Sequence, residues 1–330
     1  MKLIKYNHSD HSKTWNDYVN NHDYGNVFHL IEWKNIIEKA YGWKNKYFLI
    51  EQDHQIIGIA PFFEMYKPFK KYWISLPYVA YSSILSNRTI TIDDFLERLQ
   101  RPPKKIVTRK LSNVKLESNV VTMMINLDLD KEAFWMQLGK SQRKYVRRCE
   151  KEGFNFNVEN NSVLDDFYEI YKKNLTRLGT PQHSKLFFSL ILKELDEKVK
   201  FFSIRNQENK IVAIQLSFLH KKTMYNYTGF ADPEYTAKRV GTLLAWGCIK
   251  YAIENNFKHL DYGRSTVGTG PYNYKLQWLA KPQSLEYITQ EKNSAKSLQI
   301  PQPGIFSKLW SKLPQVISTP VGPSIRKYIP

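Results

Sequence analysis

The sequence of 330 residues has few of the side chains that staple small secreted domains or build metal sites. It contains two cysteines, Cys149 and Cys248, and neither lies in a CxxC pair or beside histidines at ligand spacing. A disulfide framework and a structural zinc site are therefore not expected. His29, His183 and His220 have no Ser or Cys partner motif and no HExxH spacing, so we assign them no catalytic role and predict no metal site.

Long hydrophobic runs are also missing. A membrane-spanning helix needs about 20 consecutive apolar residues, and no run in this sequence approaches that length. The stretch from Met1 to Asp10 is polar and does not resemble a secretory signal. The expected location is the cytoplasm, with peripheral contact at the inner face of the membrane as an additional expectation.

Acidic residues are scarce relative to basic ones. Asp and Glu number 31 against 49 Lys and Arg, which gives a formal net charge of +18. RNA, a phosphorylated substrate, CoA and an acidic membrane surface would each be attracted by this charge, which does not choose among them. The hydrophobic fraction of 42% is enough for two modest cores, so the length predicts two domains.

One order of elements occurs twice, about 155 positions apart. The first copy is a helix at 28–40 ended by Gly42, followed by strands at 46–50, 56–63 and 72–76. The second copy is a helix at 167–179, followed by strands at 198–204, 211–218 and 224–230. Ile57-Gly58-Ile59 aligns with Val212-Ala213-Ile214. This repeat predicts two similar domains.

The second copy continues into a crossover. After the strand at 224–230 come the loop ADPEYTAKRVG, a helix at 242–255 and a short strand at 259–262, which together form a βαβ unit. Backbone N–H groups and the helix dipole at KRVGTL can hold a phosphate. The predicted cofactor-binding residues are Lys238, Arg239, Gly241 and Thr242. The alternative is an ordinary turn between strand and helix with basic flanks.

The most unusual stretch is LDYGRSTVGTGPYNYKLQW at 260–278, with three glycines and three tyrosines. It follows the crossover strand, and ligands of α/β sheets bind beyond the carboxyl ends of strands. A cation at Lys275 can stabilise the oxyanion of a tetrahedral intermediate, or it can be a surface lysine on a strand. Asp261 can orient Arg264 or act as a base, or it can be a structural ion-pair partner.

A basic stripe and a C-terminal amphipathic segment complete the candidates. The stripe can contact phosphates of RNA or of a lipid-linked substrate, or it can be a solvated face; it consists of Lys140, Arg143, Lys144, Arg147, Arg148 and Lys151. A short helix predicted at about 304–313 can touch an acidic inner leaflet or pack on the core. Its apolar residues are Ile305, Phe306, Leu309, Trp310 and Leu313, flanked by Lys308 and Lys312.

Taken together, these segments resemble the FemAB/FemABX-like transferases of the GNAT superfamily, and most closely their FemAB-like branch associated with exosortase and exopolysaccharide gene clusters. The resemblance spans nearly the full length and is carried by SLPYVAYSS, SQRKYVRRCEKEG, YKKNLTRLGTPQHSKLFF, GFADPEYTAKRVGTLLAWGCIKYA and DYGRSTVGTGPYNYKLQW. Ala80 departs from an Asp of that branch, and Ser82-Ser83 replace glycines.

The resemblance implies an α/β fold of two tandem GNAT-like domains, each a mixed twisted sheet flanked by helices. The expected domains are 1–130 and 131–285, followed by a tail at 286–330 that packs on the fold or on a membrane surface. The implied function is transfer of an acyl or aminoacyl group to a cell-envelope or exopolysaccharide precursor. Acyl-CoA or aminoacyl-tRNA would be the co-substrate, and no permanently bound cofactor is implied.

The resemblance also implies roles for individual residues. Lys275 in YKLQW matches the family's lysine linked to the transition state, although Trp278 replaces the usual Phe. Lys238 and Leu243 depart from the pyrophosphate loop R/Q-x-x-G-x-G/A of CoA-dependent relatives. The residues expected to bind substrate are Tyr78 and Tyr81 on the acceptor side, and Tyr227, Tyr272 and Tyr274 around the reaction centre.

Two other functions remain open. One is an aminoacyl-tRNA-dependent peptidyltransferase acting on a peptidoglycan-type precursor, although the helical-hairpin arm of some tRNA-using relatives has no counterpart in this sequence. The other is a non-catalytic polysaccharide-associated or membrane-associated binding module, against which the glycine-rich segment with Lys275 argues.

Overall fold

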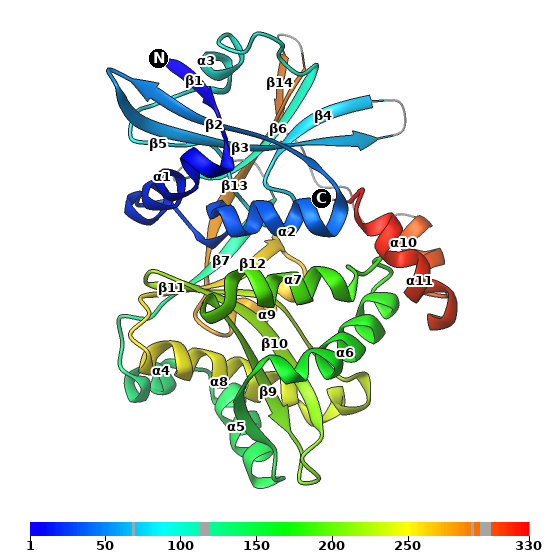
Figure 1. Cartoon of the computed structure of the whole chain (residues 1–330). Helices are drawn as coiled ribbons and strands as arrows, with labels where there is room; N and C mark the ends of the chain where they lie inside the picture. Colours follow the sequence, from blue (N-terminus) through cyan, green and yellow to red (C-terminus); the bar gives the residue numbers. More distant parts are fainter. Residues whose placement is uncertain (68–69, 113–118, 292–293, 298–304, 330) are drawn as a thin grey trace. The chain divides into compact units, whose positions relative to one another are not determined.

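The computed structural model describes residues 1–67, 70–112, 119–291, 294–297 and 305–329 (Figure 1). The chain divides into two compact units: unit 1 comprises Met1–Ser118, Ser284–Ile300 and Lys327–Pro330, and unit 2 comprises Asn119–Gln283 and Pro301–Arg326. Compared with the expected domains, Asn119 to Asp130 joins the second unit, and the tail is divided between both. In the described ranges, no helix is both long and apolar enough to span a bilayer.

Unit 1 is built on a sheet with the strand order β1-β2-β3-β4-β6-β13. Its β4 and β6 run parallel, whereas its other neighbouring strands are antiparallel. The strands are β1 (Lys2–Lys5), β2 (Lys44–Gln52), β3 (Gln55–Lys67), β4 (Lys70–Ser75), β6 (Lys105–Leu111) and β13 (Lys281–Glu291), with β5 (Leu85–Ser86) on β3 and β14 (Ser294–Ser297) on β13. The helices are α1 (His8–Asn21), η1 (Val27–His29), α2 (Ile31–Tyr41) and α3 (Ile92–Leu96).

Alternation along β2 gives this sheet two buried faces. Phe48 packs against Phe95 of α3, with ring centroids 5.8 Å apart. The preceding residue, Tyr47, stacks on Trp15 of α1, with ring centroids 4.8 Å apart. Successive strand residues point to opposite faces, so one strand serves both cores. Gly42 ends α2 in the left-handed conformation with φ of 68°, as its position predicted.

Unit 2 is built on a sheet with the order β7-β12-β11-β10-β9-β8, in which only β11 and β12 are parallel neighbours among the described pairs. Figure 1 shows α6 and α7 in front of this sheet and α8 behind it. The strands are β7 (Val120–Asn126), β8 (Asn155–Glu159), β9 (Val199–Arg205), β10 (Ile211–His220), β11 (Thr223–Ala231) and β12 (His259–Thr266).

The helix α8 contributes many residues to the core of unit 2. Val240, Leu243, Trp246 and Ile249 of α8 are buried, and α5 packs against this helix. The helices are α4 (Lys131–Gln137), α5 (Lys140–Lys151), η2 (Asn161–Val163), α6 (Leu164–Arg177), α7 (Lys185–Leu195), η3 (Asp196–Lys198), η4 (Pro233–Lys238), α8 (Val240–Glu254), α9 (Gly270–Leu276), α10 (Ile305–Trp310) and α11 (Gln315–Arg326).

The two sheets follow one plan, which confirms the predicted duplication. A strand, two helices and three strands form β1-α1-α2-β2-β3-β4 in unit 1 and β8-α6-α7-β9-β10-β11 in unit 2. A parallel strand follows in each, β6 beside β4 and β12 beside β11. The last strand of each sheet is antiparallel and comes from the other half of the sequence. The strand β7 follows β6 in sequence but pairs with β12 of unit 2, and β13 follows α9 in sequence but pairs with β6 of unit 1.

Candidate active site

A cavity of about 740 Å³ in unit 2 opens where two parallel strands diverge. Pairing between β11 and β12 ends at Tyr225 and Asp261, after which β12 continues along β7. The cavity is lined by the part of β11 that pairs with β10 but no longer with β12 (Asn226–Ala231), by Tyr262 and Arg264 of β12, and by parts of α8 and α9. It therefore occupies the carboxyl end of the crossover, where α/β sheets bind ligands.

Lys275 points its ammonium into this region from α9. Its Nζ donates to the carbonyl oxygen of Arg264 at 2.9 Å and to that of Gly263 at 3.0 Å. It also lies 5.9 Å from the ring centroid of Tyr262. An ammonium has three N–H donors, so two are used by the contacts described here and one is left for a ligand atom.

The backbone that holds Lys275 is shaped by a bulge in β12. The register with β7 shifts between Asp261 and Arg264, and Gly263 adopts φ of 77°, where a side chain would be strained. The Asp261 carboxylate accepts the Gly263 N–H at 2.8 Å and the Thr122 hydroxyl at 2.6 Å. The buried Asp261 thus fixes the backbone at Gly263, whose carbonyl accepts from Lys275.

The surroundings of Lys275 lower its proton affinity. Burial lowers the pKa of Lys275 to about 8; Asp261 raises it in part, and Arg264 lowers it further. Burial disfavours the charged form, and the negative charge of Asp261 opposes that effect. The Lys275 ammonium is thus held charged at neutral pH but close to its titration range.

A chain of tyrosines connects α9 to the start of α8. Tyr262 and Tyr274 are hydrogen-bonded to each other, and the Tyr274 hydroxyl donates to the Gly241 carbonyl at 3.1 Å. Burial raises the pKa of both tyrosines, so both are neutral donors at physiological pH. Tyr227 also lines the cavity. Tyr272 instead is partly buried and packs against the unit 2 core, in which Trp278 is fully buried.

The residues expected to bind the cofactor cluster at the N-terminus of α8. Arg239 precedes this helix in the left-handed conformation, with its guanidinium 5.1 Å from the Tyr145 ring of α5. Lys238 pairs with Glu152 at 3.3 Å. Gly241 lines the cavity, whereas Thr242 is largely buried. Within the described residues no side chain caps α8, and a helix N-terminus without such a cap favours an anion.

Sequence reasoning missed several polar residues that line this cavity. One signal was available: Gln215 interrupts the apolar run IVAIQLSF of β10, and it is buried in the structure. The other residues lie on elements that are separated along the chain and come together only in the folded structure. The missed polar residues are Asn174, Arg177, Gln215, Asn226, Thr228 and Thr236.

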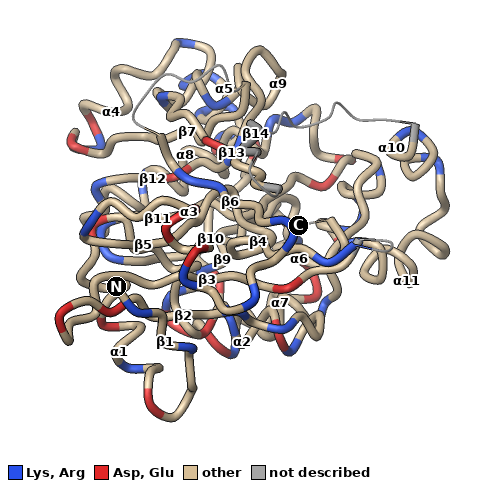
Figure 2. Tube along the Cα trace, turned by 90° about the horizontal axis from the view of Figure 1, so that it is seen from above, with Lys and Arg blue, Asp and Glu red and all other residues tan. Residues whose placement is uncertain are grey.

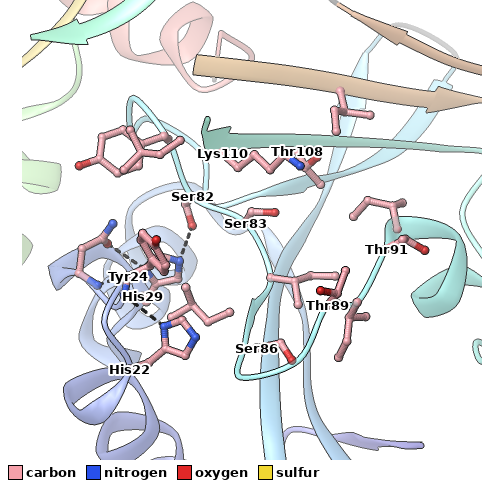
Figure 3. Close-up of a pocket in the computed structure, with 18 of the residues that line it drawn as sticks. His22, Tyr24, His29, Ser82, Ser83, Ser86, Thr89, Thr91, Thr108 and Lys110 are labelled. Atoms are coloured by element: carbon pink, nitrogen blue, oxygen red, sulfur yellow. Dashed lines mark hydrogen bonds between the residues drawn. The ribbon is translucent and has the colours of Figure 1, made fainter. Parts of the chain in front are cut away.

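Unit 1 contains a second cavity of about 490 Å³, and hydroxyl groups predominate among its polar lining groups. Figure 3 shows His29 and Ser82 pointing toward one another at its wall, and His29 Nε2 lies 3.0 Å from Ser82 Oγ. His29 Nδ1 lies 2.9 Å from the Asn26 side-chain oxygen. The cavity's hydroxyl-bearing residues include Ser82, Ser83, Ser86, Thr89, Thr91 and Thr108.

The two tyrosines expected near the acceptor differ in position. Tyr81 lines the unit 1 cavity. Tyr78 is buried, and its hydroxyl accepts from Trp43 Nε1 at 3.0 Å and donates to the Lys327 carbonyl at 2.6 Å. Tyr78 therefore anchors the end of the chain on unit 1.

The cysteines are not activated nucleophiles. Burial raises the pKa of Cys149 to about 11, and burial also raises the pKa of Cys248, which lines the unit 2 cavity. Both thiols are protonated at neutral pH, and a protonated thiol is a poor nucleophile.

Comparisons with known proteins agree with this geometry. Residues 140–276 match the family model described as an acetyltransferase (GNAT) domain. No curated protein matches the chain at a significant level. The matched segment starts at α5 and ends at α9, and so contains the crossover and Lys275.

Solved structures of low sequence identity share the fold. FemX is 14% identical with a TM-score of 0.65, covering 96% of this chain and all (100%) of its own. A tandem GNAT protein from the clavulanic acid biosynthesis pathway is 6% identical with a TM-score of 0.55, covering 89% of this chain and 99% of its own. The C-terminal domain of an Agrobacterium fabrum protein described as a lysylphosphatidylglycerol synthetase is 12% identical with a TM-score of 0.54, covering 87% and 93%. The chain thus has the mixed α/β fold of tandem GNAT structures over nearly its whole length.

Proposed function

We propose that the GNAT-type domain of unit 2 transfers an acyl or aminoacyl group to a cell-envelope or polysaccharide precursor. The observation that carries this proposal is the Lys275 ammonium, fixed by two backbone carbonyls at a cavity next to an uncapped helix N-terminus. A fixed cation stabilises charge that develops on an acyl oxygen, and a helix N-terminus favours the phosphates of a donor.

The reaction requires little else from the protein. The acceptor nucleophile attacks the acyl carbonyl carbon, the carbonyl oxygen becomes negative, and the remaining N–H of Lys275 donates to it. The intermediate then collapses and expels the thiolate or alkoxide of the donor, which takes up the proton lost by the acceptor. Holding donor and acceptor together supplies much of the rate enhancement. Arg264, which also lines the cavity, adds a second cation.

Acyl-CoA is the leading donor. Its pyrophosphate would lie at the start of α8, where Gly241 lines the cavity and Arg239 supplies a positive charge. The GNAT match over 140–276 supports this choice, because that family implies a donor of the acyl-CoA type.

Aminoacyl-tRNA is the second candidate donor. Lys140, Lys144, Arg147, Arg148 and Lys151 of α5 are exposed, and they lie along the helix that packs against α8. Such a stripe can bind the phosphates of RNA in a salt-dependent way. The fold shared with FemX agrees with a transferase of this type but does not choose between the donors.

The acceptor would be recognised in unit 1. The hydroxyl, imidazole and amide groups around the unit 1 cavity match the hydrogen-bonding needs of a polyhydroxylated ligand, and Tyr81 adds an aromatic surface. A non-catalytic binding module would use the same cavity. Donor deacylation that survives Lys275→Ala unchanged would favour that alternative.

Equilibrium binding of the purified protein to acetyl-CoA and to charged and uncharged tRNA, each at low and moderate salt, tests the donor. Saturable binding of acetyl-CoA that is weakened in Arg239→Gly supports acyl-CoA; glycine tolerates the left-handed backbone at 239, so this variant removes the cationic side chain without straining the backbone. Preference for charged over uncharged tRNA supports aminoacyl transfer. Failure of the protein to bind any of these donors would contradict the proposal.

A further inference from the structure

The two C-terminal helices turn apolar side chains outward. On α10, Phe306 and Leu309 are 49% and 62% exposed, and on α11, Val316, Ile317 and Val321 are 84%, 47% and 43% exposed. Single exposed hydrophobic residues are ordinary on protein surfaces, but a group on two consecutive helices marks an interaction surface. We refer to these five residues as the C-terminal apolar face.

The opposite side of α11 explains why this face is exposed. Ser318 and Gly322, one helical turn apart, are buried, and the Ser318 hydroxyl lies 3.2 Å from that of Thr176 on α6. The Gln182 amide donates to the Ser318 carbonyl at 3.0 Å, and a Cβ at Gly322 would come within 2.3 Å of the Gln182 side-chain oxygen. The close contact therefore uses small and polar groups, which leaves the bulky residues of α11 on the outside.

The short helix α10 is anchored in a similar way. Trp310 is 3% exposed, and the backbone of Ser307 lies against Gly179, where a Cβ would meet the Ser307 carbonyl oxygen at 2.2 Å. Phe306 stacks on Trp310 with ring centroids 5.6 Å apart. One side of α10 thus packs on the fold while Leu309 points away from it.

Charge beside the apolar face has one sign. Lys308 and Lys312 are exposed, and the sequence has no Asp or Glu after Glu291. In Figure 2, α10 carries blue segments, and neither α10 nor α11 carries red. Lysine is depleted in protein–protein interfaces, whereas apolar residues flanked by lysines are typical of helices that lie on anionic membranes.

We infer that α10 and α11 dock the protein on an anionic lipid surface. The C-terminal apolar face would insert among the headgroups and upper acyl chains, while Lys308 and Lys312 would contact lipid phosphates. This inference goes beyond acyl transfer and does not depend on it, because none of these residues lines the unit 2 cavity.

Sedimentation of the full-length protein with vesicles tests the inference. We expect the wild type to pellet with phosphatidylcholine vesicles that contain phosphatidylglycerol, and to pellet less at high salt. Replacing both Leu309 and Val316 by Asp should lower the partition coefficient at least tenfold, about what the burial of one large side chain contributes. The matched control replaces Met136 and Val158, which are 67% and 49% exposed on α4 and β8, by Asp. This control should bind like the wild type.

Several results would overturn the inference: wild-type protein that stays in the supernatant, equal pelleting with pure phosphatidylcholine, or equal loss in both double variants. Self-association without vesicles that Leu309→Asp with Val316→Asp abolishes would instead identify the face as an interface between copies of this chain. Circular dichroism would confirm that both variants remain folded, as is expected because the replaced side chains are exposed.

Discussion

Units 1 and 2 share a strand plan but differ in the helix that joins their parallel strands. In unit 2, β11 and β12 are joined through the 15-residue α8, which has no acidic residue in its first turn and no side-chain cap among the described residues. In unit 1, β4 and β6 are joined through the 5-residue α3, whose N-terminus is closed by a Thr91–Asp94 capping box and carries Asp93 and Asp94. The N-terminus of α8 therefore favours an anion, whereas the acidic N-terminus of α3 repels one.

This difference shows how one duplicated plan gives two kinds of site. The start of α8 has no side-chain cap among the described residues and lines the same cavity as Lys275, which would suit a phosphate-bearing acyl donor. The unit 1 cavity contains Asp93 and a lysine, Lys110, whose charge is already paired with Glu286 at 2.9 Å. Fold equivalence therefore does not carry the chemistry over, because the site residues decide it.

Replacing Lys275 should have the largest effect. We expect Lys275→Met to lower donor deacylation by a hundredfold or more, roughly the cost of removing one oxyanion donor, with donor binding little changed. The matched change in unit 1, Lys110→Met, should leave deacylation unchanged. Release of free thiol from acetyl-CoA, or deacylation of aminoacyl-tRNA, measures both. Equal effects of the two variants on deacylation would contradict the assignment of the reaction to unit 2 alone.

Making the start of α8 resemble that of α3 should have the next largest effect. A Cβ atom at Gly241 would meet no atom within 4 Å, so Gly241→Asp can place a carboxylate at the helix N-terminus without a clash at Cβ. We expect acetyl-CoA affinity to fall about tenfold at low salt and to recover partly with salt. The isosteric Gly241→Asn should retain most of the affinity. A similar loss in both variants would mean that shape, and not charge, excludes the ligand.

The pH profile should show the titration of Lys275. Because burial lowers its pKa to about 8, the charged form is lost as pH rises through that value. If the ammonium stabilises the transition state, kcat should fall toward tenfold per pH unit above about 8. Stability should change in the opposite sense: between about 8 and the ordinary lysine value near 10.5, the unfolded chain binds more protons, so the unfolding free energy rises with pH. Activity that rises through pH 8 would instead assign Lys275 the role of a base.

Substitutions at two glycines in one segment distinguish the effect of backbone strain on stability from an effect on activity. Gly263 and Gly268 have φ of 77° and 80°, so each change to Ala should cost about 1 to 2 kcal/mol of stability. Only Gly263 contributes a carbonyl to Lys275, and we therefore expect Gly263→Ala to reduce deacylation several-fold more than Gly268→Ala. Thermal unfolding measures the change in stability, and thiol release measures deacylation. Equal deacylation rates in both variants would argue against a role for the Gly263 carbonyl in holding Lys275.

The smallest effect is expected in unit 1. Ser82→Ala removes the contact with His29 Nε2 and leaves a buried ring nitrogen without that partner, which should cost about 1 to 2 kcal/mol. Acetyl-CoA binding should not change, because both residues line the unit 1 cavity only. Denaturant unfolding with a binding isotherm checks both statements. A change in donor affinity would show that this cavity takes part in donor binding.

Periodicity predicted the regular parts of this fold well. The strands of both hairpins and the crossover helix appear within a few residues of their predicted bounds, and the residues of the basic stripe lie on the helix α5. These elements combine apolar periodicity with clear turn residues, which act locally. The site's general position followed for the same reason, because a βαβ crossover fixes where its strands end.

The elements that were missed depend on contacts distant in sequence. The alternative that placed Lys275 on a strand is wrong, because Lys275 lies on α9, which begins at Gly270 with Pro271 in its first turn, where proline suits a helix. Pro320 and Pro323 argue against a helix, yet α11 forms through its contacts with α6 and Gln182. The two carbonyls that accept from Lys275 are positioned by a bulge in β12, and a bulge leaves no periodic pattern in the sequence.

The exchange of terminal strands has a consequence for synthesis on the ribosome. The first half of the chain to be made is the last to be complete, because β6 lacks its neighbour until the residues of β13 emerge after all of α9. At ordinary elongation rates this interval lasts roughly ten seconds or more. During that time β6 is an open edge that can pair with another chain. Premature termination shortly before β13 would therefore damage the half of the protein that had already been translated.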